Sequence, residues 1–374
     1  MSKHGTPASE NQSPSPAQDP PTFAMEDSWE TINAHFHENN WTDGLPIVPP
    51  TKERVGAMLD YAQAELGWER SDVIAVLAPR KGKATVEKIS TNAVMAGCAP
   101  EYLPVLIAAT KAMAVPEFNL FGVQTSTHNT SVLAIVNGPL REKLDINWGY
   151  NVVGSRWRST ASIGRAIRFI MTNIGGIPDA TNLHTQGHIA RYQHCIAENE
   201  SESPWEALHV ERGMDPQESS ITVFGACPAM MIDDNSGSRH AKELLNTFAR
   251  SIAYVGNRNI NGEGEPLIIM CPTHARLLAN GGYAKEDVKR FLWERGRVPF
   301  GHIPTGNLQS YSERFLKFYG DFGPDFGVPI ADKPEDIVIV VMGGQGTHSL
   351  SVQTLLGSRS QTVPITRKDG TPLS

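Results

Sequence analysis

The stretch CIAENESESPWEALHVERG, residues 195–213, is the densest gathering of chemically active side chains in the chain. It holds a cysteine, a histidine, an arginine, a tryptophan and five glutamates, with few aliphatic residues. Carboxylates beside an imidazole can shift one another's pKa values, which is how many enzymes prepare a general acid and a general base. We therefore expect catalytic acid–base groups here, namely Glu198, His209 and Glu211.

The favoured nucleophile is a cysteine upstream of this stretch. Cys98 lies just before a helix that we expect to begin at Pro100, and the free N–H groups and dipole of a helix N-terminus favour an anion. A thiol in that position can have a lowered pKa and react as the thiolate. The alternative is a small residue buried between helices, since free cysteine is among the most buried residue types. Cys227 and Cys271 each follow an expected strand and allow the same two interpretations.

Arginine residues are the candidate binders of an acidic group on the substrate. Arg156 and Arg158 precede an expected helix at 164–175, and Arg212 follows His209 in the acidic stretch. A guanidinium group can hold a carboxylate through two parallel hydrogen bonds. Trp205 is a further candidate for substrate contact. The alternative is a solvent-exposed arginine face and a tryptophan that only anchors a loop.

The same region supports a metal site as an alternative. His184, His188, Cys195 and His209 are donor types that zinc or iron accepts. Their spacing matches no established signature, because HTQGH lacks the glutamate of an HExxH helix. The cofactor therefore stays open between none and a transition metal.

These groups need strands and helices to position them. Ligands of open α/β sheets bind beyond the carboxyl ends of the strands. Short apolar runs that end in turn residues predict several buried strands. The five expected carboxyl ends are AP at 78–79, NGP at 137–139, GACP at 225–228, CP at 271–272 and GGQGTH at 343–348, and three of the five carry a reactive or glycine-rich feature.

The alternation of strands with amphipathic helices predicts an α/β protein. The segments LAIVNGPLREKLDIN and LIIMCPTHARLLANG share a strand, a proline and a short helix, which indicates two related α/β lobes with mainly parallel sheets. We expect a disordered, proline- and serine-rich tail at 1–24, an N-terminal lobe at 25–175, an irregular active-site segment at 176–219 and a C-terminal lobe at 220–374.

The bulk composition excludes several classes of protein. The 374 residues carry a formal net charge of −7, which argues against nucleic acid as the main partner. We expect no membrane span, because no run of 18 apolar residues occurs. The N-terminus lacks the apolar core of a signal peptide, and the four cysteines form no CxxC pair. These features predict reduced thiols and a cytoplasmic location.

Three segments together resemble a family associated with, or fused to, UGSC-type thiol/selenol proteins. They are TDGLPIVPPTKERVGAML, ATVEKISTNAVMAGCAPEYLPV and CIAENESESPWEALHVERG, and the resemblance extends over about residues 40–360. This chain lacks a UGSC or CGSC tetrad, so the redox chemistry of that module is not transferred to it. The resemblance implies proximity to thiol chemistry and places Cys98 and Cys195 in the matching segments.

These patterns together predict an enzyme that acts on a small organic molecule. The reaction would be redox chemistry or bond cleavage assisted by the Cys98 thiolate, at a site between the lobes that residues 176–219 cover. The alternatives are a metal-dependent hydrolase or lyase and a non-catalytic subunit of a multiprotein complex. The expected partner is a small-molecule substrate, without nucleic acid or membrane; a homo-oligomer and a thiol-protein partner stay open.

Overall fold

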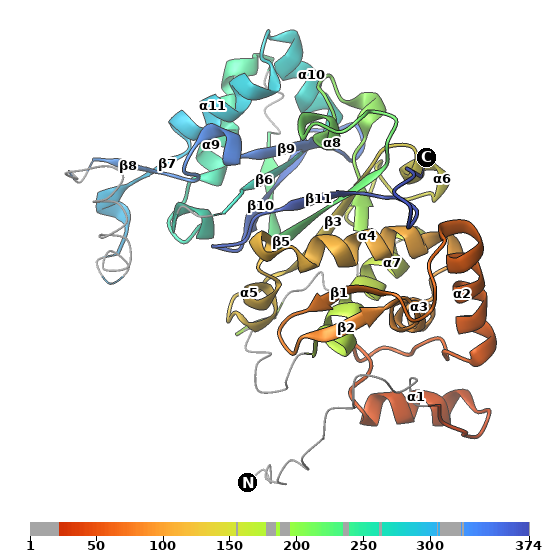
Figure 1. The fold of residues 1–374 in the computed structure, drawn as a ribbon. Coiled ribbons are helices and arrows are strands. Elements are labelled where there is room, and N and C mark those ends of the chain that lie inside the picture. Colours follow the sequence, from red (N-terminus) through yellow and green to blue (C-terminus); the bar gives the residue numbers. More distant parts are fainter. Residues whose placement is uncertain are drawn as a thin grey trace.

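One seven-stranded sheet runs through the centre of the molecule (Figure 1). The computed structural model describes residues 22–154, 156–176, 185–187, 195–234, 239–261, 264–304, 306, 323 and 325–373. The strand order is β4-β3-β5-β10-β6-β9, and β11 also pairs with β5. The strands are β3 (Ser131–Asn137), β4 (Cys195–Ala197), β5 (Ser220–Asp233), β6 (Leu267–Met270), β9 (Val338–Val341), β10 (His348–Thr354) and β11 (Gln361–Pro364).

The sheet is mixed. Strand β3 is parallel to β4 and β6 is parallel to β9, whereas the other ladders among the described strands are antiparallel. The 14-residue β5 pairs with β3 and also with β10, so it joins the two parallel pairs. The α/β class is confirmed. The expected mainly parallel sheet differs from this arrangement, because a short apolar run predicts a buried strand without fixing its direction.

The sheet curls until its two edge strands meet. The N–H group of Asn199, just after β4, donates to the Val341 carbonyl of β9 at 2.8 Å. The Val341 N–H donates to the Glu198 carboxylate at 3.3 Å. The carboxyl ends of β4 and β9 therefore lie together. Apolar side chains from one face of the sheet form a core within the curl, among them Leu133, Ile135, Ile196, Phe224, Leu267, Ile269, Val340 and Val352.

Two helical layers cover the other face of the sheet, below and above it in Figure 1. One layer contains α2 (Lys52–Leu66), α3 (Val86–Met95), α4 (Leu103–Ala114) and α7 (Arg158–Phe169), and it packs on β3 and the first half of β5. The other contains α9 (Ala241–Ile252), α10 (Pro272–Asn280) and α11 (Lys285–Arg295), and it packs on β6 and β9.

Local sequence signals account for these helices. Thr51 accepts a hydrogen bond from the Arg54 N–H at the start of α2, and Thr85 does the same for Lys88 at the start of α3. In α9 the buried Leu244, Phe248 and Ile252 recur every four residues, so one stripe of the helix faces the sheet.

Shorter elements complete the described chain. The short helices are α1 (Trp29–Glu38), α5 (Leu120–Thr125), α6 (Leu140–Lys143) and α8 (Leu208–Glu211). Two small antiparallel sheets pair β1 (Val73–Leu77) with β2 (Gly82–Thr85) and β7 (Arg297–Pro299) with β8 (Gly327–Pro329). Single helical turns are η1 (Pro100–Tyr102), η2 (Pro116–Phe118), η5 (Glu200–Glu202), η6 (Arg258–Asn261), η7 (Phe300–His302) and η8 (Pro334–Asp336), and η3 (Ile170–Gly176) is a π-helix.

The chain after β11 packs against the first helical layer. Ile365 is wholly buried in the core beneath that layer. The Lys368 N–H donates to the Leu66 carbonyl at the end of α2 at 2.9 Å, and the Lys368 ammonium group pairs with Asp72 at 2.6 Å. Segments almost 300 residues apart are therefore bonded to each other.

The expected irregular segment at 176–219 is in large part a component of this sheet. Its strand β4 pairs with β3, and Cys195, Glu198 and His209 are wholly buried. Residues 195–199 and 207–209 are buried parts of the protein interior rather than a surface lid, whereas most of residues 200–206 and 210–218 are partly or fully exposed. Residues 177–184 and 188–194 lie outside the described residues, as does the expected tail up to residue 21. The division into two lobes stays a prediction.

Among the described residues, no single helix combines the length and the apolar character needed to cross a membrane. Two consecutive helical segments, Pro100–Ala114 and Pro116–Thr125, reach that length and apolar character only when they are taken together, and the chain bends between them. Most residues of α4, which forms most of the first segment, are buried inside the protein.

Candidate functional site

The carboxyl ends of the parallel strands β3 and β4 bring polar side chains together inside the protein. Asn137 is the last residue of β3, Glu198 directly follows β4, and both are wholly buried. The Asn137 Nδ2 donates to Glu198 Oε2 at 2.7 Å and to Glu200 Oε1 at 3.0 Å. The Gly138 N–H donates to the same Glu200 oxygen at 2.7 Å. One amide thus holds two carboxylates beside each other.

Three further side chains complete this group. Ser220 begins β5 and lies opposite Asn137 in the ladder. Arg141 of α6 has its Nε 3.5 Å from Glu200 Oε1, and its guanidinium lies over the Trp148 ring at 5.0 Å. His209 of α8 is wholly buried and has Glu200 and Arg141 among its electrostatic neighbours. We name this group the β3–β4 cluster: Asn137, Arg141, Glu198, Glu200, His209 and Ser220.

Six polar atoms of the β3–β4 cluster are buried without a hydrogen-bond partner. They are Asn137 Oδ1, Arg141 Nε and Nη1, both ring nitrogens of His209, and Ser220 Oγ. The Pro216 backbone interacts with His209 and raises its pKa, and Arg141 Nε forms an ion pair with Glu200 at 3.5 Å, which is long for a hydrogen bond. An unmade buried hydrogen bond costs about 1–3 kcal/mol, so native proteins leave few of them. Such atoms require a polar ligand or ordered water to complete their hydrogen bonds.

Burial sets the charge of two members of the cluster. Desolvation raises the pKa of Glu198, although the Lys285 charge and hydrogen bonds from the Leu208 N–H and Asn137 oppose it. Desolvation lowers the pKa of His209, against the opposing charge of Glu200, so its imidazole is neutral at pH 7. A neutral imidazole can accept a proton. A carboxyl group and an imidazole with pKa values shifted in these directions are typical of acid–base sites.

Glu211 lies on the same helix as His209 but in a different environment. Lys285 Nζ lies 2.9 Å from Glu211 Oε2, and Lys289 pairs with the other carboxylate oxygen. Burial alone would raise the pKa of Glu211, but the two nearly buried ammonium groups outweigh it and the pKa is lowered. Glu211 is therefore a carboxylate held by α11 rather than a member of the β3–β4 cluster.

A cavity of about 640 Å³ lies beside α8. Its lining includes Glu211, Arg212 and Lys289, and its volume falls in the range of small-molecule sites, roughly 300–1,000 Å³. Arg212 donates to Thr362 Oγ1 at 2.7 Å and to Ser360 Oγ at 2.6 Å. Both terminal nitrogens of this guanidinium are therefore already engaged by β11 and the residue before it.

Cys98 lies apart from the β3–β4 cluster. Burial raises the pKa of its thiol to about 12, although Ser162 and Arg158 act in the opposite direction. The expected lowering is therefore wrong. The turn that follows Cys98 is the three-residue η1, and the surrounding apolar core removes the water that would stabilise a thiolate. In the described part of the chain, no hydrogen bond or ion pair joins Cys98 to the expected acid–base residues.

The remaining expected substrate binders contact the protein or the solvent. Arg158 donates through Nε and Nη2 to the Gly97 carbonyl at 3.3 and 3.1 Å, which ties α7 to the loop before Cys98. Arg156 is exposed. Trp205 Nε1 donates to the Tyr283 carbonyl at 3.2 Å, and its ring packs at the edge of the second helical layer. Their roles in substrate binding stay predictions.

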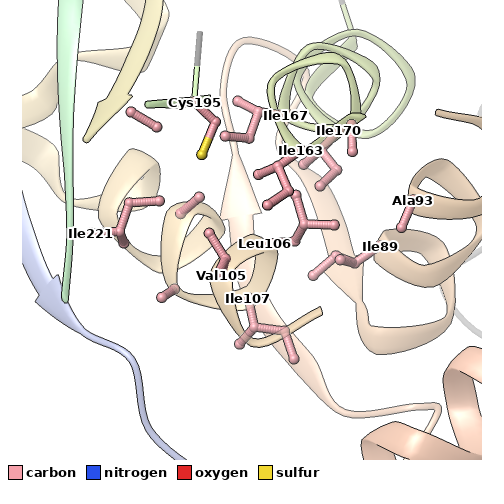
Figure 2. Close-up of a cluster of buried hydrophobic side chains, with 14 of the residues drawn as sticks. Ile89, Ala93, Val105, Leu106, Ile107, Ile163, Ile167, Ile170, Cys195 and Ile221 are labelled. Carbon is pink, nitrogen blue, oxygen red and sulfur yellow. The ribbon is translucent and has the colours of Figure 1, made fainter. Parts of the chain in front are cut away.

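The expected metal ligands are described only in part. His184 and His188 lie outside the described residues. Figure 2 shows Cys195 in the same apolar cluster as Ile163 and Ile167 of α7, and this burial raises the pKa of its thiol. The described ranges contain no group of three or more histidine, cysteine, aspartate or glutamate side chains arranged to hold a metal ion.

Sequence reasoning missed four members of the cluster, namely Asn137, Arg141, Glu200 and Ser220. The sequence did contain a signal for Asn137, namely the glycine that follows it at the end of β3. In the structure this Gly138 has a φ of +82°. A Cβ atom on Gly138 would lie 2.3 Å from the Glu218 carbonyl, so only glycine fits this turn. Such a turn at a strand end marks a place where ligands bind in α/β sheets.

No protein-family model matches the chain, and no curated protein matches it in sequence. The resemblance to the UGSC-associated family therefore rests on the three segments alone. One of them contains Asp43, whose carboxylate receives two hydrogen bonds from Arg165 of α7, at 2.7 and 2.8 Å. Another forms β4, η5 and α8. The functional argument accordingly rests on the geometry of the cluster.

Proposed function

We propose that the protein is an enzyme that acts on a small polar organic molecule by acid–base chemistry at the β3–β4 cluster. One observation carries the proposal: six buried polar atoms of Asn137, Arg141, His209 and Ser220 make no hydrogen bond of good geometry. Asn137 lies at the carboxyl end of β3, beside the end of the parallel strand β4, and α/β proteins bind their ligands at such ends. A ligand that made these hydrogen bonds would recover the free energy that their absence costs.

The types of these atoms define roles. His209 is the base, because its imidazole is neutral at pH 7 and can take a proton from an acidic C–H or O–H group. Arg141 presents unpartnered Nε and Nη1 donors, which suit the substrate oxygen on which negative charge then develops. The Ser220 hydroxyl and the Asn137 carbonyl orient the substrate. Glu198 and Glu200 position the Asn137 amide from one side.

The substrate class follows from these roles. It is a small carbonyl or carboxylate compound with an acidic hydrogen next to the oxygen that faces Arg141. The proposed step moves a proton and no electrons, so it needs no oxidant. A catalytic role for Cys98 stays a prediction that this scheme does not require.

Hydrogen–deuterium exchange tests the scheme without knowledge of the full reaction. The full-length protein is incubated in D₂O with a panel of small keto and carboxylic acids, and loss of C–H signal is followed by ¹H NMR. We expect enzyme-dependent exchange in at least one compound, lost in His209→Gln and reduced in Arg141→Met. The matched control is His37→Gln, since His37 is exposed on α1. Exchange that persists in His209→Gln, or that occurs in no compound, would count against the proposal.

A further inference from the structure

The cavity beside α8 adjoins the apolar core inside the curled sheet. Leu208 of α8 and Val338 of β9 line the cavity and also belong to that core. Thr362 of β11 lines it from the sheet. The guanidinium of Arg212, in the same wall, lies 5.9 Å from the ring centroid of Phe224, a further residue of the core. Small-molecule sites often occur where a closed or curled sheet opens, so the position of this cavity suits a ligand.

Lys289 of α11 presents a charged group to this cavity with part of its hydrogen-bonding capacity unused. Its side chain is 8 % exposed, and an ammonium group has three N–H donors. Within the described ranges its one partner is the Glu211 carboxylate. Because Lys289 lines the cavity, the remaining donors of this nearly buried ammonium group are left for the contents of the cavity.

The positive charges around Lys289 exceed the negative ones. Lys285 and Lys289 share the single Glu211 carboxylate. Lys285 is the better supplied of the two, because it also donates to the Glu206 carbonyl at 2.6 Å. The other acidic neighbour of Lys285 is Glu198, but burial raises the pKa of that carboxyl group and so disfavours its charged form. Among the described residues, one positive charge at the Lys289 end of the cavity therefore lacks a counter-ion.

Arg212 and Glu265 form a separate, balanced part of the wall. The terminal nitrogens of Arg212 donate to the hydroxyl groups of Ser360 and Thr362, and the Glu265 carboxylate accepts the Ser360 N–H. Desolvation lowers the pKa of Arg212, and the charge of Glu265 opposes that shift. These two residues thus offset each other across Ser360, and neither supplies the counter-ion that Lys289 needs.

The rest of the lining defines the remainder of the ligand. Leu208, Met214, Val338 and Pro364 give the cavity apolar walls, which suit an apolar body. Glu335 of η8 also lines the cavity and is exposed, so a carboxylate lies at its rim. A negative charge there repels a second anionic group on the ligand.

We propose that this cavity binds a small organic monocarboxylate. The carboxylate pairs with Lys289, and the apolar body packs against Leu208, Met214 and Val338. Glu335 selects against dicarboxylates. This binding site is distinct from the β3–β4 cluster, and the proposal does not depend on the function of that cluster.

Isothermal titration calorimetry of the full-length protein at pH 7 tests the proposal. The probes share a six-carbon chain and differ in charge: hexanoate, the dicarboxylate adipate and the cation hexylammonium. We expect hexanoate to bind with a Kd below about 1 mM, and the other two to bind about tenfold more weakly. Undetectable binding of hexanoate, or equal binding of adipate or hexylammonium, would overturn the proposal.

Substitution of Lys289 locates the bound carboxylate. Lys289→Met should weaken hexanoate binding about tenfold, in keeping with the loss of a charged hydrogen-bond donor. The fold should persist, since Lys285 still pairs with Glu211 in that variant, and thermal unfolding checks this. The matched control is Lys52→Met, because Lys52 is exposed at the start of α2, and it should bind hexanoate as the wild type does. Hexanoate affinity that is unchanged in Lys289→Met would show that the acid does not bind at this wall.

Selectivity gives a readout that a general loosening of the fold would not change. Glu335→Gln removes the charge at the rim and should strengthen adipate binding severalfold, with little change for hexanoate. Met214→Glu places a carboxylate in the cavity and should weaken hexanoate binding about tenfold. If Glu335→Gln leaves the ratio of the two affinities unchanged, the role assigned to the rim carboxylate is wrong. Wild-type hexanoate affinity in Met214→Glu would exclude this cavity as the site.

Discussion

The Asn137 amide and the Glu198 carboxylate are joined by a 2.7 Å hydrogen bond that links the carboxyl ends of β3 and β4. Glu198 also accepts the Leu208 N–H at 2.8 Å, and Leu208 directly precedes His209. The same carboxylate accepts the Val341 N–H at 3.3 Å. One buried side chain therefore connects β3, α8 and β9, and it fixes the position of the base that we propose.

Substitution of Glu198 by glutamine should change how stability depends on pH. Because burial raises the pKa of Glu198, the folded protein keeps this proton to a higher pH than the unfolded chain, where the value is about 4.3. The stabilisation is thus fully present below that pH and is lost as the pH rises through the folded-state pKa. The wild-type free energy of unfolding should fall relative to Glu198→Gln between pH 5 and pH 8, by about 1.4 kcal/mol for each unit of pKa difference.

Urea unfolding at each pH measures this difference. The exposed Glu206→Gln variant is the matched control, and it should show no such trend. A wild-type free energy of unfolding that rises relative to that of Glu198→Gln as the pH increases would contradict the raised pKa.

Substitution of His209 by leucine should separate stability from function. Both ring nitrogens of His209 are buried without partners, so an apolar side chain of similar size removes an unmet hydrogen-bonding need. We expect the free energy of unfolding at pH 8 to stay level or to rise by about 1 kcal/mol, while deuterium exchange is lost. A loss of more than about 2 kcal/mol would show that His209 has a partner in solution.

The pH dependence of that variant provides a second test. Burial lowers the pKa of His209, so its contribution to stability is present above the unfolded value of about 6.5 and is lost as the pH falls through that value. Wild type should therefore lose more stability than His209→Leu between pH 7 and pH 5. Equal losses in the two proteins would contradict the assigned shift.

Substitution of Glu211 by glutamine should be strongly destabilising. It leaves Lys285 and Lys289, which are nearly buried, without their shared carboxylate. Removal of one partner of a buried ion pair costs about 3–5 kcal/mol, because an uncompensated charge remains. Chemical denaturation checks the cost, and the Glu211→Gln/Lys289→Met double variant should recover part of it. A loss below about 1 kcal/mol would mean that water reaches the two ammonium groups.

Substitution of Cys98 by alanine should affect packing alone. The thiol is buried in the first core and lies apart from the β3–β4 cluster, so we expect a loss of about 1 kcal/mol in the free energy of unfolding. Deuterium exchange should continue at the wild-type rate. Loss of deuterium exchange in a folded Cys98→Ala protein would show that this cysteine takes part in the reaction.

The sequence foretold the positions of several strand ends and the presence of polar groups near them. NGP, CP and GGQGTH lie at the ends of β3, β6 and β9, because an apolar run ended by a turn residue is a local signal. The expected strand end GACP at 225–228 was wrong, because β5 continues through Cys227 to Asp233. Glu198 bonds the Leu208 N–H just before His209, and Glu200 of the same acidic stretch raises the pKa of His209.

Local sequence patterns could not predict the contacts between segments that lie far apart in the chain. Ser220 joins Asn137 only through the pairing of β3 with β5, and the two lysines that hold Glu211 come from a helix more than 70 residues away. The hydrophobic pattern also could not predict whether neighbouring strands run parallel or antiparallel. The predicted lowering of the Cys98 pKa was wrong because the position of this residue before a helix gives no information about the apolar core that surrounds it.

The packing of β11 and the following residues bears on the order in which the protein can be made. During synthesis, α2 and α4 emerge long before β5, and β11 emerges some 250 residues after α4. Since α4 packs against both β5 and β11, its apolar surface has no complete cover until residues 361–373 have been translated. The nascent chain therefore exposes this apolar helix surface through most of its own elongation, and such exposed surface favours aggregation until the C-terminal strand has been made.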